Sequence, residues 1–286
     1  MRVTILKKNS KTLLTAYLLV VPAVALVMLI VAYPIFSSIV LSFTDKSGKF
    51  TLSNYAYFFM NKQELSNILF TLYIAIITVV LSIVIAYAIA LYLRFVKTPV
   101  SRLIGGLYLI PRFVPSVVAV YAMMIIVKDS GLLNRISKLF GGNFKPGLMY
   151  NPNGMIIMNL WFNIPFAALI IVSSLGSIPD SIVESARDVG AKKMKTFVTM
   201  ILPLSYKDVL TAATFVFLGN VGSFTTPYLM MGSTTPKMLG IDLFQQFNSY
   251  MDYQKTAALS VIMFLICSIS AGVYIYTNLK KDRKDE

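Results

Sequence analysis

A small set of polar side chains interrupts otherwise apolar stretches of the sequence, and these residues are the first candidates for chemistry. Arg112 lies between Pro111 and Pro115 in the run LIPRFVPSVV. An arginine in this setting has two possible roles. It either attracts a negatively charged group of a bound solute, or it donates hydrogen bonds to backbone carbonyls that the prolines leave without partners. Both roles place the guanidinium at a break in a helix.

The other polar candidates carry amide, hydroxyl and indole groups, and they lie in two further apolar runs. They are Asn159, Trp161, Asn163, Asn220, Ser223, Thr225 and Thr226. Asn159 and Asn163 are one helical turn apart, so they share one helix face. Hydrogen bonding between neighbouring helices is one role for these groups, and lining a path for a polar solute is the other.

Groups that catalysis requires are scarce in this chain. It contains no histidine and one cysteine, Cys267, so we expect no metal site and no intrachain disulfide. It has no G-x-x-x-x-G-K-S/T loop for nucleotide phosphates, and no pairing of a nucleophile with a base is recognisable. The sequence therefore predicts neither an enzyme nor a cofactor bound by this chain.

Long apolar runs carry the polar candidates. Of all residues 57% are apolar and the mean hydropathy is +0.72, which is above the values of soluble domains. A membrane span needs about 20 mostly uncharged residues, and six runs qualify: 13–43, 67–93, 103–127, 154–175, 209–231 and 256–279. The first is too long for a signal peptide, and we expect it to be retained. The sequence thus predicts an all-α membrane protein with six spans in one domain, 1–286.

The net charge of +14 reflects an uneven distribution of basic residues, and we expect no nucleic-acid partner. Basic residues gather at both termini and in two connecting segments: Arg2, Lys7, Lys8 and Lys11; Arg94, Lys97 and Arg102; Arg187, Lys192, Lys193, Lys195 and Lys207; Lys280, Lys281, Arg283 and Lys284. Cytoplasmic segments of membrane proteins carry such an excess. Both termini and the segment 176–207 are therefore predicted to be cytoplasmic, and the bilayer lipid is a partner.

Two of the predicted outer loops contain short amphipathic helical patterns. The apolar positions are Leu132, Leu133, Ile136 and Leu139 in loop 128–153, and Leu239, Leu243, Phe244 and Phe247 in loop 232–255. Such helices either rest in the outer membrane interface or form a docking surface for an extracytoplasmic partner.

The segment 176–207 is charged and amphipathic although it connects two apolar runs. Pro179 suits a first helical turn, with Ser177 or Asp180 as its cap, and Gly190 supplies the positive φ that ends this helix. Its expected inner face holds Ile182, Ala186 and Val189. A second helix, with Met194, Phe197, Val198 and Ile201 on one face, is expected to end at Pro203. Helices this short need a surface to pack on, either anionic lipid or a groove of another protein.

This segment resembles a loop of the permease subunits of binding-protein-dependent ABC importers. Their pattern is E-A-A, three residues, G, nine residues and I-x-L-P. The chain has Glu184, Ala186, Gly190, Leu202 and Pro203 in that register, with Ser185 and Met200 where Ala and Ile are usual. The motifs LSFTD and GLLN and the six-span layout are also similar to this family.

The resemblance implies a type I importer permease in a bacterial cytoplasmic (inner) membrane. It implies that the loop is a coupling helix docking with ATPase subunits, which bind ATP and Mg²⁺. The residues assigned to coupling are Glu184, Ser185, Ala186, Asp188, Gly190, Ala191, Leu202 and Pro203. The other implied partners are a second permease subunit and an extracytoplasmic solute-binding protein, so the chain is expected to form a path for a small polar solute.

The runs ESARDVGA and LGNVGSFTTPYLMMG are more similar to the polyamine, ferric-iron, thiamine and phosphonate branch of this family than to the sugar branch. Arg112 has no acidic group at the same depth, so an anionic or zwitterionic solute such as a phosphonate is expected over a polyamine, and a sugar stays open. The alternative function is an ion-coupled secondary transporter. It requires Asp, Glu or His inside the membrane, and the predicted spans contain none.

Overall fold

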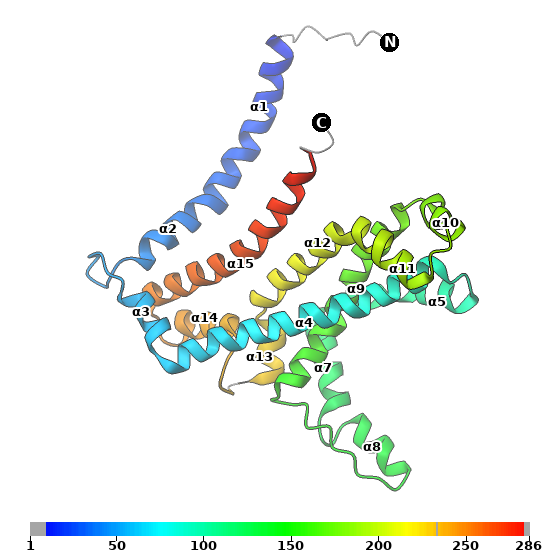
Figure 1. Cartoon of the computed structure of the whole chain (residues 1–286). Coiled ribbons are helices and arrows are strands. Elements are labelled where there is room, and N and C mark those ends of the chain that lie inside the picture. Colours follow the sequence, from blue (N-terminus) through cyan, green and yellow to red (C-terminus); the bar gives the residue numbers. More distant parts are fainter. Residues whose placement is uncertain (1–9, 233, 283–286) are drawn as a thin grey trace.

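The computed structural model describes residues 10–232 and 234–282, and this part of the chain is almost entirely helical (Figure 1). Six of its helical stretches are long and apolar enough to cross a membrane: Leu18–Ser42, Lys62–Phe95, Ser116–Leu139, Pro152–Ser177, Lys193–Val221 and Tyr253–Asn278. The only β pairing among the described residues is one antiparallel bridge between Thr44 and Phe50. The predicted all-α fold class is confirmed. Arg2, Lys7, Lys8, Arg283 and Lys284 lie outside the described residues.

The first span is one continuous helix despite its two prolines. It comprises α1 (Ser10–Val27), a π-helical turn η1 (Met28–Ala32) and α2 (Tyr33–Ser42). The N–H of Tyr33 donates to the carbonyl of Met28, one residue further back than in an α-helix. This wider turn accommodates Pro34, which has no N–H to donate. None of the most apolar window of this span is buried, and Figure 1 shows α1 apart from the central helices.

The third apolar run, 103–127, is not a single helix. It is divided into α5 (Pro99–Leu107), α6 (Ile110–Phe113) and α7 (Ser116–Val127). Pro115 is the N-cap of α7 in an extended conformation, which separates it from α6. The break that the two prolines predict is thus present, and Arg112 belongs to the short α6.

The fifth run, 209–231, also differs from expectation at both ends. The helix α12 (Leu202–Val221) continues α11 (Lys193–Thr196) through a second π turn, η2 (Phe197–Ile201), so no helix ends at Pro203. The N–H of Leu202 donates to the carbonyl of Phe197, and Pro203 follows in the first turn of α12. At the other end, residues 222–224 separate α12 from α13 (Thr225–Met231).

Three helices form the centre of the molecule: α4 (Lys62–Phe95), α9 (Pro152–Ser177) and α12. Figure 1 shows them side by side. Much of their shared core consists of alanines, namely Ala86, Ala90, Ala167, Ala168 and Ala212. Small side chains let helix backbones approach closely, which is the usual packing between helices in a membrane.

Shorter helices cover the ends of this centre. At the end where α4 and α9 begin, α3 (Ser53–Met60), α14 (Leu239–Asn248) and α15 (Tyr253–Asp282) share a core around Phe58, Leu239 and Leu259. A Cβ atom on Gly240 would lie 2.3 Å from the carbonyl oxygen of Ser223. Glycine is therefore required where α14 meets the break between α12 and α13. At the opposite end, α10 (Asp180–Asp188) and α11 form a helical hairpin.

Candidate coupling and translocation sites

The hairpin of α10 and α11 is closed by hydrogen bonds of its own backbone. Gly190 has a φ of 77°, and its N–H donates to the carbonyl of Arg187 at 2.8 Å. The N–H of Ala191 donates to the carbonyl of Ala186 at 3.0 Å. These two bonds with a left-handed residue form a Schellman motif, in which glycine avoids the steric penalty of positive φ. The predicted turn at Gly190 is present, whereas no side chain caps the start of α10.

The hairpin presents charged and apolar groups on its outer surface. Glu184, Ser185 and Asp188 are exposed, and Ala186 is buried together with Val183. Val189 was expected on the inner face of the first helix together with Ala186, but it is 83% exposed. On the second arm Ile201 is buried, while Met194, Val198, Leu202 and Pro203 are exposed and Ala191 is half-buried. Carboxylates and apolar side chains together suit contact with another protein better than contact with an anionic bilayer.

Arg94 joins the hairpin to the transmembrane centre. It lies in the last turn of α4, and its Nε donates to the carbonyl of Leu175 at 3.1 Å. Its Nη2 donates to the carbonyl of Ile178 at 2.9 Å and also to the carboxylate of Asp180. The guanidinium therefore holds the linker between α9 and α10. In the sequence, Arg94 is only one of the basic residues that predict a cytoplasmic segment. Nothing in the sequence places it beside residues 175–180.

A second connection links α4 to the other arm. The hydroxyl of Tyr87 lies 2.7 Å from the Oγ of Ser205 in α12, and both residues are buried. The ring of Tyr87 also packs edge-on against Phe197, with centroids 5.7 Å apart. Side chains of α4 therefore contact both arms of the hairpin directly.

Arg112 lies on the face of α9 rather than at the broken backbone. Its guanidinium carbon is 4.9 Å from the ring centroid of Phe166, a distance typical of a cation–π contact. Phe166 in turn packs edge-on against Phe215 of α12 at 6.3 Å. In the described part of the chain the Arg112 side chain makes no hydrogen bond to a backbone carbonyl. We call the exposed surface around Phe166 and Phe215 the α9–α12 face.

The remaining path candidates divide into exposed and buried residues. Trp161 is exposed and Asn163 is half-buried on α9, so both reach the surface. Asn159 and Asn220 are buried; Asn163 donates to the backbone carbonyl of Asn159, and Asn220 donates to that of Val216, each at 2.7 Å.

Ser223 and Thr225 lie half-buried at the break before α13. The structure does not gather all these residues around one cavity.

Sequence reasoning missed a cleft at the hairpin end of the α9–α12 face. Its volume is about 480 Å³, and its lining residues are Leu169, Ile170, Ser173, Ser174, Ser177 and Asp208. Asp208 was overlooked because the fifth span was expected to begin at residue 209, one position after it. In the structure Asp208 lies within α12, beyond its first turn.

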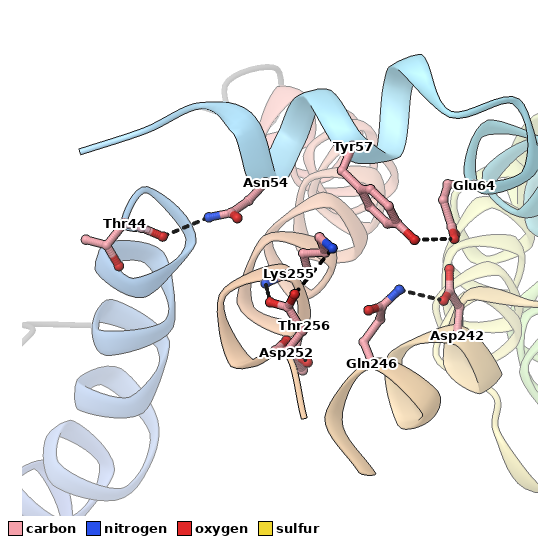
Figure 2. A network of polar contacts seen from close by, with 9 residues as sticks. All are labelled: Thr44, Asn54, Tyr57, Glu64, Asp242, Gln246, Asp252, Lys255 and Thr256. Atoms are coloured by element: carbon pink, nitrogen blue, oxygen red, sulfur yellow. Dashed lines mark hydrogen bonds and ion pairs between the residues drawn. The ribbon is translucent and has the colours of Figure 1, made fainter. Parts of the chain in front are cut away.

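Two buried carboxyl groups face each other at the opposite end. The Tyr57 hydroxyl donates to Glu64 at 3.0 Å, and Asn67 donates to Glu64 at 3.1 Å and to Asp242 at 3.4 Å. Gln246 donates to Asp242 at 3.4 Å (Figure 2). Burial, followed by the hydrogen bond and the negative charge of Glu64, raises the pKa of Asp242 to about 7. This network fastens α14 to α4.

The two outer amphipathic patterns have different environments. In α14, Leu239 is fully buried and Leu243 is half-buried, so this helix packs on the body of the protein. In α8 (Leu132–Leu139) the predicted apolar positions Leu132, Leu133, Ile136 and Leu139 are all exposed. The apolar face of α8 is therefore available to the membrane interface or to a partner, as are Phe244 and Phe247 of α14, which are also exposed.

Six helices able to cross a membrane, a helical hairpin at one end and a broken helix around Arg112 are features expected of a transport subunit. Residues 82–283 match the family described as "Binding-protein-dependent transport system inner membrane component". The match covers more than half of the chain, and the chain therefore belongs to this family.

Similar curated proteins are transport permeases. The chain is 27% identical over 226 residues to the spermidine/putrescine transport system permease protein PotB of Escherichia coli (strain K12), covering 79% of this chain and 82% of that protein. It is 28% identical over 193 residues to the thiamine transport system permease protein ThiP of Brucella abortus (strain 2308), covering 67% of this chain and 35% of that protein. These similarities confirm a permease subunit of the inner membrane in place of an enzyme.

Solved structures show the same fold. A bacterial ABC transporter involved in the import of the acidic polysaccharide alginate aligns with a TM-score of 0.80 at 16% identity, covering 96% of this chain and 98% of that chain. The MetNI methionine ABC transporter aligns with a TM-score of 0.57 at 17% identity, covering 76% and 95%. The predicted type I importer permease fold is confirmed.

Proposed function

We propose that this permease receives the closure of an ATPase through the α10–α11 hairpin and transmits it to α4, α9 and α12. The observation that carries the proposal is the attachment of the hairpin, which Arg94 and Tyr87 join to α4 through the contacts described above. A rigid connection of this kind converts a displacement of the hairpin into a movement of the central helices. The exposed residues Glu184 and Asp188 then face the ATPase, and the Schellman turn at Gly190 fixes the angle between the two arms.

The partners follow from the relatives and from the unpartnered surfaces of this chain. One similar solved transporter is described in complex with a periplasmic protein that carries an alginate pentasaccharide. We infer that this chain likewise receives its solute from an extracytoplasmic binding protein. A second permease subunit covers part of the exposed apolar surface. The ATPase chains bind ATP and Mg²⁺, because this chain has no phosphate-binding loop.

The proposed path runs along the α9–α12 face. Arg112 contacts Phe166 on this face, and Asn163 lies one helical turn before Phe166 on α9. Ser223 and Thr225 lie at the broken end of α12, and Trp161 is exposed elsewhere on α9. Transporters use broken helices at such positions because the free backbone groups bind polar solutes. Asn159 and Asn220 are buried in the packed interior, and the amide of Asn220 donates to the carbonyl of Val216 in its own helix. Family membership favours this importer over the ion-coupled secondary transporter.

Charge reversal on the hairpin tests the coupling role. In the complete importer reconstituted in proteoliposomes, with putrescine, spermidine and thiamine as probes, we expect Glu184→Lys to abolish uptake and solute-stimulated ATP hydrolysis. Glu184→Gln should have a smaller effect, since it keeps the side-chain volume. Asp129→Asn, which keeps the acceptor for the N–H of Gly147, is the control for charge removal and should retain both activities. Full uptake by Glu184→Lys would refute the role of this residue.

A further inference from the structure

Oxygen atoms from two helices line the cleft at the hairpin end of the α9–α12 face. Ser173, Ser174 and Ser177 follow one another along α9, and Asp208 lies opposite on α12. Ser173, Ser177 and Asp208 are exposed, whereas Ser174 is buried. Leu169 and Ile170 supply the apolar part of the wall. The volume of about 480 Å³ is enough for a small organic molecule.

The carboxylate of Asp208 retains unused capacity to accept hydrogen bonds. Its Oδ2 accepts a hydrogen bond from the Oγ of Ser174, but its Oδ1 makes none within the described residues. No lysine or arginine nitrogen among the described side chains of residues 18–232 and 234–278 forms an ion pair with it, although Lys207 is its neighbour in sequence. A carboxylate has about four lone-pair positions, so several remain available.

The chemistry of the lining favours a cation that carries N–H groups. The Oγ of Ser177 already donates to the carbonyl of Ser174, so its oxygen can still accept a hydrogen bond. An ammonium group has three donors and a positive charge, which match one carboxylate and adjacent hydroxyl oxygens. An anion would be repelled by Asp208, and a neutral polyol would gain nothing from its charge.

The cleft is continuous with the proposed path. Asp208 and Phe215 are seven residues apart in α12 and so lie on one helix face. Phe215 packs against Phe166, whose ring already holds the guanidinium of Arg112 at 4.9 Å. Aromatic rings that accommodate one cation can accommodate the cation of a solute in the same way.

We propose that Asp208, Ser173 and Ser177 form a binding site for the ammonium group of an organic cation at the cytoplasmic end of the path. The inference rests on the proposed function, because the cleft is useful only if solute passes along the α9–α12 face. It departs from the anionic solute that the sequence favoured. That expectation depended on Arg112 as the ionised group of the path, and Asp208 adds a negative charge on the same face.

Thiol protection tests the site without measuring transport. Leu169→Cys, on the exposed apolar wall of the cleft, is introduced in a Cys267→Ala background, and the complete nucleotide-free complex is labelled with a maleimide. Mass spectrometry then gives the labelling rate of residue 169. We expect putrescine and spermidine to slow labelling, and 1,4-butanediol and succinate to have no effect. Asp208→Asn should raise the half-protecting putrescine concentration about tenfold, and Ser177→Ala should raise it about threefold.

Matched variants separate the possible outcomes. Asp129→Asn, which preserves the acceptor for the N–H of Gly147, is the control and should leave protection unchanged. Asp208→Glu keeps the charge and should retain protection if Asp208→Asn fails to assemble. Equal protection by succinate or butanediol, or no protection by either ammonium compound, would overturn the site. So would dissociation of the complex by both Asp208 variants, because the carboxylate would then hold a partner subunit.

The failure of this site is distinguishable from a failure of the proposed function. The same preparation is assayed for ATP hydrolysis stimulated by the binding protein. Stimulated hydrolysis without cation protection would refute the Asp208 site and leave the coupling proposal standing. Cation protection without stimulated hydrolysis would refute the coupling proposal and support the site.

Discussion

Arg94 and Asp180 form an ion pair across 86 residues of sequence, and this pair connects the end of α4 to the start of the α10–α11 hairpin. The Arg94 side chain is 18% exposed, whereas that of Asp180 is 71% exposed. The ion pair itself therefore contributes little, and the two bonds from Arg94 to the carbonyls of Leu175 and Ile178 carry most of the connection.

Removal of this guanidinium should uncouple the hairpin from α4. We expect Arg94→Ala to reduce uptake per ATP hydrolysed about tenfold, because hydrogen bonds from a charged group are worth about 1.5–3 kcal/mol. Arg94→Lys should retain part of the coupling, since a lysine has no planar fork for several acceptors. The measurement is uptake and ATP hydrolysis in the same proteoliposomes. Arg135→Ala on the exposed α8 is the control, and an unchanged ratio in Arg94→Ala would contradict the connection.

Gly190 should tolerate asparagine better than valine. A side chain at a φ of 77° costs roughly 1–2 kcal/mol, and a β-branched side chain costs more, whereas asparagine adopts this conformation more readily. Gly190→Val should therefore abolish uptake while leaving the affinity of the binding protein for its solute unchanged. Gly190→Asn should retain measurable uptake. The order of the two variants in uptake assays checks the turn, and equal activity would show that the positive φ is dispensable.

Arg112 should contribute little to stability, because its observed contact is one cation–π pair worth about 0.5–1 kcal/mol. We expect Arg112→Gln to leave the Tm of the complex nearly unchanged and not to reduce putrescine uptake. In a Cys267→Ala background, an Arg112→Cys thiol should label at different rates in nucleotide-free and vanadate-trapped complexes. A large loss of Tm with equal labelling in both states would assign Arg112 a structural role. A selective loss of uptake would favour the anionic solute.

The attachment of α14 should weaken as pH rises. The pKa of Asp242 is raised from 3.8 to about 7, so the protonated form is favoured in the folded protein. The stabilisation that this proton provides is complete below pH 3.8 and is lost as pH rises through 7. Hydrogen exchange of α14, corrected for the intrinsic pH dependence, should be faster at pH 8 than at pH 6.

Asp242→Asn should remove this pH dependence, because a neutral amide replaces the titrating carboxyl group. Asp252→Asn serves as the control, since Asp252 pairs with Lys255 and not with Glu64. A persistent pH dependence in Asp242→Asn would assign the effect to another group.

Several features of this protein were determined by the sequence alone, because they depend on local patterns. Six apolar runs of sufficient length fix the membrane class, since hydrocarbon tolerates few charges and no unpaired backbone. The register of Glu184, Gly190 and Pro203 predicts the coupling segment, and Gly190 forms the predicted turn. Pro111 and Pro115 likewise predict a broken helix around Arg112 through their missing N–H groups.

Other features were decided by the tertiary structure, because they depend on residues distant in sequence. Pro203 was expected to end a helix, yet the π turn Phe197–Ile201, anchored by Tyr87 against Phe197 and Ser205, carries the helix past it. In the sequence, Arg94 indicates only that its segment is cytoplasmic. The packing of α4 against α9 places it beside Leu175 and Ile178, where it donates hydrogen bonds to their carbonyls. From the sequence, Asp208 was expected to lie just before the fifth span. In the structure it lies within α12, and its Oδ2 accepts a hydrogen bond from the Oγ of Ser174. Only the packing of α9 against α12 brings these two atoms together.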